Sequence, residues 1–197
     1  MKDTVDNTVA YYEPSTCDLE EFTALIEQET QREHVPHAAA VEKNIPIYDM
    51  ANLRSALEEG RARRGIMAEW AKVLRSGAGV IALKGAYAHS AILDEATRIY
   101  KRIIADEKQR LGGVGDHFAA SGANDRIWNA LQKLCEASPE AFLRYFANTS
   151  IAAVCEAWLG PNYQMTAQVN LVHPGGAAQQ AHRDYHLGFQ TADVSVS

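Results

Sequence analysis

The stretch that decides the fold is Gln168-Val-Asn-Leu-Val-His-Pro-Gly-Gly-Ala-Ala-Gln-Gln-Ala-His182-Arg-Asp184-Tyr-His186. It begins as an apolar, strand-like run, passes through a Gly-rich loop and opens a second extended run at His182. A neutral imidazole and a carboxylate are ligands that Fe(II) accepts from proteins, and two ligands on one short segment leave coordination positions open. The segment therefore predicts a non-haem iron site that uses His182 and Asp184.

The spacing of these residues is similar to that of a known family. Gln168-x-Asn170, His173-Pro-Gly and Gln179-x-x-His182-Arg-Asp184-x-His186 together resemble the phytanoyl-CoA dioxygenase family of Fe(II)/2-oxoglutarate oxygenases. The resemblance implies a double-stranded β-helix, which is a cupin-like jelly-roll barrel. It also implies an iron triad of His182, Asp184 and a His on a later strand, with an Arg soon after that His to bind 2-oxoglutarate. The implied activity is hydroxylation of a small organic metabolite, with Fe(II) as cofactor and 2-oxoglutarate and O2 as co-substrates.

The fold class that we expect is α+β, in a single domain over residues 1–197. A flexible arm (1–17) precedes a mainly helical region with one early strand (18–160), and the opening strands of the barrel follow (161–197). No His follows His186 and no Arg follows Arg183. We therefore expect a truncated form with an incomplete barrel, inactive as it stands. We also expect a second copy or another partner to cover the exposed sheet edge, because a bare edge favours association.

Three further residues are candidates for binding 2-oxoglutarate. Gln168 and Asn170 match positions where the family lines the co-substrate pocket, and residues two apart on a strand point to the same side. The alternative is that they are polar groups on a partly solvated strand. Lys84 ends a predicted buried strand, 80–85, and either contacts a carboxylate or is solvated.

Other polar residues are candidates for the substrate pocket. Asp116 and His117 follow a Gly-rich run and either line the pocket or cap the loop. His186 shares a strand face with His182, but four residues of strand span about 13 Å. Metal–imidazole bonds are about 2.0–2.1 Å long. His186 is therefore predicted to line the pocket rather than to be the third ligand.

Composition excludes several classes of protein. The net charge is −6 and no basic stripe offsets it, so a nucleic-acid partner is not expected. No apolar run is long enough to cross a membrane, and the acidic N-terminus does not resemble a signal peptide. Three widely spaced cysteines suit reduced thiols. We expect a cytoplasmic protein.

The secondary structure follows from apolar periodicity and capping residues. Asp18 is a predicted N-cap, Ser138 and Pro139 begin a later helix, and a break is expected near Gly65. The predicted helices are 18–32, 50–74, 89–109, 126–134, 139–146 and 151–159, and the predicted strands are 45–48, 80–85 and 163–172.

Two alternatives to an oxygenase remain open. One is a non-catalytic binding or interaction protein on the same scaffold, with an incomplete metal site. The other is a predominantly helical protein without metal, in which His182-Arg-Asp184 forms a surface ion pair.

Overall fold

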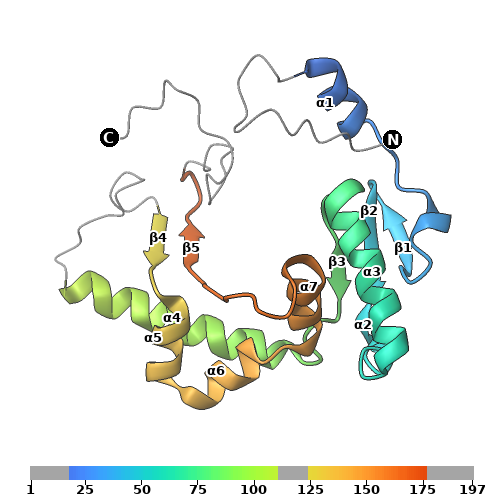
Figure 1. The fold of residues 1–197 in the computed structure, drawn as a ribbon. Helices are drawn as coiled ribbons and strands as arrows, with labels where there is room; N and C mark the ends of the chain where they lie inside the picture. Colours follow the sequence, from blue (N-terminus) through green and yellow to red (C-terminus); the bar gives the residue numbers. More distant parts are fainter. Residues whose placement is uncertain (1–17, 111–123, 177–197) are drawn as a thin grey trace. The chain divides into compact units, whose positions relative to one another are not determined.

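A computed structural model describes residues 18–110 and 124–176, which combine helices with two small sheets (Figure 1). The predicted α+β class is confirmed. The chain divides into two compact units. Met1–Gln28 and Gln179–Ser197 form one unit, of which residues 18–28 are described, and Glu29–Ala178 form the other.

The first unit contributes helix α1 (Leu19–Ile26). The Asp18 carboxylate accepts hydrogen bonds from the backbone N–H groups of Glu20 and Glu21, so the predicted N-cap is confirmed. The helix ends at Ile26 rather than continuing to residue 32, and a short 3₁₀ helix, η2 (Arg32–His34), follows.

The second unit, to which η2 belongs, contains a three-stranded sheet in the order β1 (Ala40–Glu42), β2 (Ile45–Asp49) and β3 (Ala82–Lys84). β1 and β2 form an antiparallel hairpin through Lys43 and Asn44, which both have positive φ. Two such residues in a two-residue loop match the twist of the strands. β3 pairs with β2 in parallel, so the strands predicted at 45–48 and 80–85 are both present.

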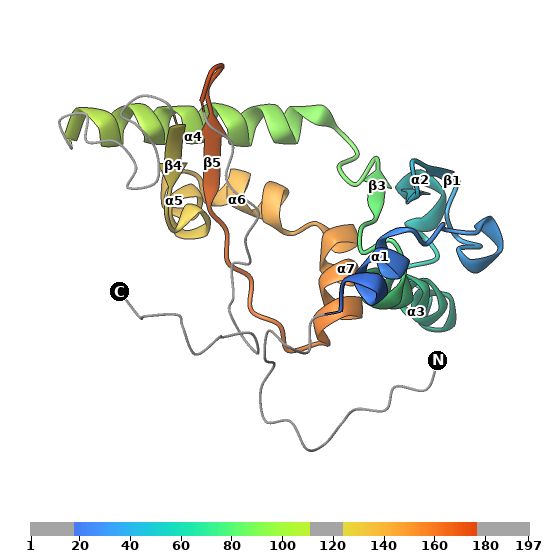
Figure 2. The same ribbon diagram turned by 90° about the horizontal axis from the view of Figure 1, so that it is seen from above.

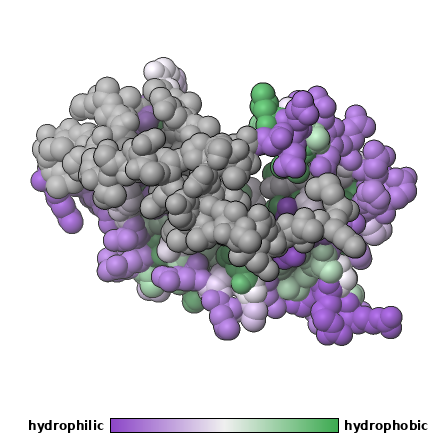
Figure 3. Space-filling view, turned by 45° about the horizontal axis from the view of Figure 1, so that its top comes forward, coloured by the Kyte–Doolittle hydropathy of each residue, from purple (hydrophilic) through white to green (hydrophobic). Residues whose placement is uncertain are grey.

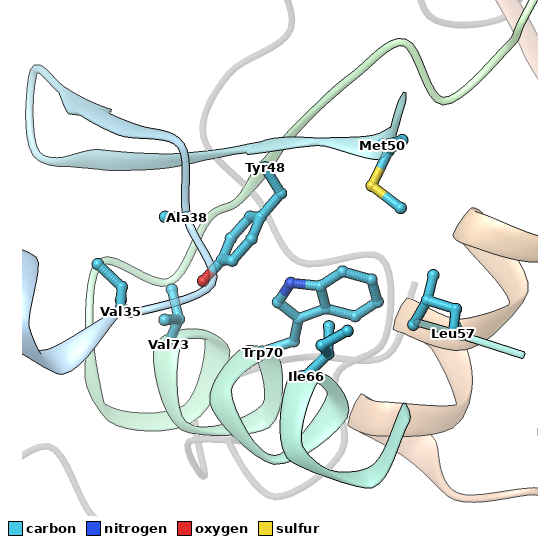
Figure 4. Close-up of a cluster of buried hydrophobic side chains, with 9 residues drawn as sticks. Val35, Ala38, Tyr48, Met50, Leu57, Ile66, Trp70 and Val73 are labelled. Carbon is cyan, nitrogen blue, oxygen red and sulfur yellow. The ribbon is translucent and has the colours of Figure 1, made fainter. Parts of the chain in front are cut away.

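Helices α2 (Met50–Leu53) and α3 (Gly60–Ser76) connect β2 to β3. The predicted break lies between these helices rather than near Gly65, through which α3 runs without interruption. Trp70 is fully buried on α3, and its ring meets that of Tyr48 edge to face, with centroids 5.6 Å apart. Figure 4 shows apolar side chains from α3 and from the β2 side converging on this pair.

A carboxylate lies inside this first core. Glu69 is 8% exposed, and its Oε1 accepts a hydrogen bond from the Tyr48 hydroxyl at 2.9 Å. Its Oε2 binds Nδ1 of His37 at 2.5 Å and the backbone N–H of His37 at 3.2 Å. Both oxygens of the buried carboxylate are therefore satisfied, as burial of a charged group requires.

The later helices are α4 (Ser90–Arg110), α5 (Ala130–Ala137), α6 (Pro139–Phe146) and α7 (Thr149–Leu159). α7 packs on α3, whereas α4, α5 and α6 surround a second apolar core. The Ser138 hydroxyl caps α6 and Pro139 is its first residue, as predicted. The buried residues of the second core are Ala96, Ile99, Tyr100, Ile127, Ala130, Leu134 and Ala141.

A second sheet consists of β4 (Asn124–Ile127) and β5 (Val169–Val172), which are antiparallel. Figure 1 and Figure 2 show the two strands side by side. The prediction that 126–134 is one helix is wrong at its start, because Arg126 and Ile127 belong to β4 and α5 begins at Ala130. β5 is also shorter than the predicted strand 163–172.

Hydrophilic side chains cover much of the described surface visible in Figure 3, with apolar patches between them. Exposed apolar residues include Phe22 on α1 and Trp158 on α7. Among residues 18–110 and 124–176, no helix is both long enough and apolar enough to cross a membrane.

Candidate functional site

The two faces of the β4–β5 pair differ in character. Ile127 is opposite Val169 in the register, and both pack into the second core beside α4 and α5. Arg126 is opposite Asn170. Because side chains alternate along a strand, these two residues project from the face directed away from that core. The sheet therefore packs the side that carries Ile127 and Val169 against the helices and directs Arg126 and Asn170 to the opposite side.

Two of the predicted 2-oxoglutarate residues belong to this region. Asn170 is on β5 and Gln168 directly precedes the strand; both are exposed. The Arg126 guanidinium lies over the ring of Trp128, with Cζ 5.1 Å from the ring centroid, an arrangement that restrains the cation. The register thus places a guanidinium beside the predicted co-substrate residues.

The third candidate, Lys84, lies in the other sheet, at the end of β3. Its Nζ is 3.5 Å from Oδ2 of Asp49 and its side chain is 73% exposed. An ion pair so open to water contributes little to stability. The structure therefore does not bring Lys84 into the sheet that carries Asn170.

The remaining candidates lie outside the described residues. These are the predicted iron ligands His182 and Asp184, and the predicted pocket residues Asp116, His117 and His186. Within the two described segments, no group of three or more His, Cys, Asp or Glu side chains is arranged to hold a metal ion.

A polar cluster that sequence reasoning missed lies where β4 and β5 meet α4. Asp125 on β4 is 8% exposed. Its Oδ1 is 2.6 Å from Nζ of Lys108 on α4, and its Oδ2 is 2.8 Å from Nε2 of His173, just after β5. Each carboxylate oxygen therefore has a nitrogen partner from a different element.

The environment of Asp125 favours its charged form. Burial alone would raise its pKa, but the hydrogen bonds and charges of Lys108 and His173 outweigh burial and hold the pKa below the ordinary value of 3.8. The carboxylate is thus a stable negative centre at the junction of three elements.

The backbone turns sharply immediately after this cluster. The N–H of Gly176 donates to the carbonyl of His173 at 2.8 Å, and Gly175 has φ +84°. Pro174 and Gly175 are the two central residues, as in a type II β-turn, which requires a positive φ at the second of them. His173 therefore takes part in two restraints, one through its ring and one through its carbonyl oxygen.

The sequence gives only weak indications of the cluster of Lys108, Asp125 and His173. Asp125 stands in a polar run, Asn124-Asp125-Arg126, and His173 precedes the Pro-Gly pair. Nothing local links either residue to Lys108, because the contact depends on the β4–β5 register and the position of α4.

Comparison with known protein families, with curated proteins and with solved structures finds no match to this chain. Membership of the phytanoyl-CoA dioxygenase family therefore stays a prediction. It rests on the residues between Gln168 and His186.

Proposed function

We propose that this chain carries two of the iron ligands of an Fe(II)/2-oxoglutarate-dependent dioxygenase of the phytanoyl-CoA dioxygenase family, whose activity is the hydroxylation of a small organic metabolite. The observation that carries the proposal is the pair His182-x-Asp184, which follows a strand and a Pro-Gly turn. A His-x-Asp pair that arises by chance is not expected to follow a strand and a Pro-Gly turn. β4 and β5 would be strands of the double-stranded β-helix.

The chemistry of the donor set fits ferrous iron. His182 supplies an imidazole and Asp184 a carboxylate, the two ligand types of the 2-His-1-carboxylate sites in non-haem oxygenases. When bound, the iron supplies the oxidative chemistry, with 2-oxoglutarate and O2 as co-substrates. The protein's own part is to hold the metal, orient the co-substrate and limit the access of water.

The second of these tasks would fall to the polar side of β5. The Asn170 side chain can donate hydrogen bonds to a carboxylate, as can that of Gln168. Asn170 also points away from the helix-packed core, because its neighbour Val169 packs into that core. A co-substrate bound there would approach a solvated face and need not displace packed side chains.

Metal titration tests the proposal. Mn(II), a redox-stable substitute for Fe(II), is added to the wild-type chain, His182→Ala and Asp184→Ala, and binding is followed by calorimetry. We expect one equivalent to bind the wild type and either substitution to weaken binding by more than about tenfold, since even residues that only support a metal ligand account for that much.

The matched control is His89→Ala, which removes an exposed imidazole at the start of α4. It should bind Mn(II) like the wild type. If His182→Ala also matches the wild type, the proposed iron site is wrong.

A further inference from the structure

We propose that β5 pairs with β5 of a second copy of this chain, so that two β4–β5 sheets join into one antiparallel sheet across a two-fold axis. The edge concerned is the one that faces away from β4, which lies along one side of β5 in Figure 1. Within residues 18–110 and 124–176, β4 is the only strand that pairs with β5. The inference does not depend on the proposed iron site.

The first observation is the lack of charge on β5. The four other described strands each contain a charged residue, namely Glu42 in β1, Asp49 in β2, Lys84 in β3, and Asp125 and Arg126 in β4. β5, with the sequence Val169-Asn-Leu-Val172, contains none. Charged side chains on an edge strand oppose its pairing with another chain. β5 therefore lacks a protection that every other described strand carries.

The second observation is the exposed apolar surface of the strand. Leu171 is 36% exposed and Val172 is 43% exposed. Because successive side chains of a strand point to opposite faces, these two residues leave apolar surface in water on both sides of the sheet. A strand added at the free edge would cover part of both surfaces, and removal of apolar surface from water favours association.

The third observation is that β5 is complementary to itself. When a two-fold axis perpendicular to the sheet relates two antiparallel strands, the helix-facing side chains of both copies lie on the same side. Val169 and Leu171 then meet the same two residues of the second copy. Asn170 and Val172 do so on the opposite side, where one side-chain amide can donate to another and accept from it.

These pairings decide the nature of the partner. A strand with charged residues would place them beside Leu171 and Val172, where β5 offers no opposite charge. A second copy of β5 places apolar groups beside apolar groups and an amide beside an amide. The chain itself therefore supplies the strand that fits this edge.

Sedimentation equilibrium of the full chain tests the proposal. Pairing of two four-residue strands gives a small interface, so we expect the wild type to pass from monomer to dimer between about 1 and 500 μM, as weak complexes do. Hydrogen exchange, followed by NMR, identifies the contact. The backbone amides of β5 should exchange more slowly at the highest concentration than at the lowest.

Two variants and a matched control locate the interface. Leu171→Lys places like charges close together across the two-fold axis and should raise the dimer dissociation constant more than about tenfold. Val172→Lys acts from the other face of the sheet and should do the same, which covers the case in which Leu171→Lys fails to fold. Leu143→Lys is the control, because it makes the same change of residue and charge at a 61% exposed position on α6. Its dissociation constant should stay within about twofold of that of the wild type.

Three results would overturn the proposal. The first is a wild type that stays monomeric at every concentration. The second is a dimer that folded Leu171→Lys and Val172→Lys form as readily as the wild type, because the contact would then lie elsewhere. The third is an equal weakening by Leu143→Lys, because the change in net charge would then explain the effect.

Discussion

Replacing Tyr48 by Phe tests how the buried carboxylate of the first core is stabilised. The substitution removes a single oxygen atom and leaves the ring against Trp70 (Figure 4). Oε1 of Glu69 then loses the 2.9 Å hydrogen bond from the hydroxyl, whereas Oε2 keeps both bonds from His37. The change thus isolates one buried hydrogen bond to a charged acceptor.

The expected loss follows from that geometry. A hydrogen bond to a charged group contributes about 1.5–3 kcal/mol, and the acceptor here is only 8% exposed, so water cannot replace the donor. The free energy of unfolding should fall by that amount in urea titrations. For a chain of this size the melting temperature should fall by about 3–12 °C.

The same substitution has a signature at alkaline pH. Burial raises the pKa of Tyr48 far above its usual range, and the Glu69 carboxylate raises it further. The folded protein therefore binds this proton more tightly than the unfolded chain does. The resulting stability is complete below the unfolded pKa of about 10 and is lost as the pH rises above it. Stability should accordingly decline less steeply above pH 10 in Tyr48→Phe than in the wild type.

Tyr163→Phe, at a half-buried position outside both cores, is the control and should change stability by less than about 0.5 kcal/mol. If Tyr48→Phe is as stable as this control and has the same alkaline profile, the reasoning about the buried carboxylate is refuted.

Further predictions concern the second core and the turn. Because the pKa of Asp125 is lowered in the folded protein, its carboxylate stabilises the fold above the unfolded pKa of about 3.8, and this stabilisation is lost as the pH falls below that value. The stability of Asp125→Asn should therefore depend less on pH below about pH 4 than that of the wild type. The same pH dependence in both proteins would contradict this. Gly175→Ala should lower the free energy of unfolding in urea titrations by about 1 kcal/mol, because Gly175 has a positive φ; no atom crowds the added methyl group. The control Gly60→Ala, at the first residue of α3, should not lower it. Ile127→Ala should cost about 2–5 kcal/mol, since Ile127 is completely buried, and a loss below 1 kcal/mol in the same titrations would show that this core is loosely packed.

The sequence was informative wherever local chemistry decides the structure. The helix predicted at 89–109 is α4, because its apolar residues recur at helical spacing and face one core. Ser138 and Pro139 begin α6 because a side-chain acceptor and a residue without an N–H suit a helix start. Such signals need no distant partner.

Prediction failed where distant segments decide the structure. Asn124 to Ile127 is too polar to indicate a strand, and it becomes β4 only through pairing with residues 169–172. Gly65 predicted a break in the helix. Burial of the apolar face of α3 nevertheless stabilises the helix by more than the roughly 1 kcal/mol that a glycine costs in a helix. The break falls instead at residues 54–59, between α2 and α3.

The candidate site divides in the same way. The predicted ligands His182 and Asp184 and the polar pair Gln168 and Asn170 were chosen from residue chemistry and spacing alone, and their roles stay predictions. The link from Lys108 through Asp125 to His173 joins three elements and required their spatial arrangement.

Absorption spectroscopy tests the central claim most directly. Under anaerobic conditions, a 2-oxo acid that chelates protein-bound Fe(II) gives a visible charge-transfer band. We expect the wild-type chain with Fe(II) to develop this band when 2-oxoglutarate is added, and His182→Ala and Asp184→Ala to show none. A wild-type spectrum identical to those of both variants would contradict the assignment of an iron site to His182 and Asp184.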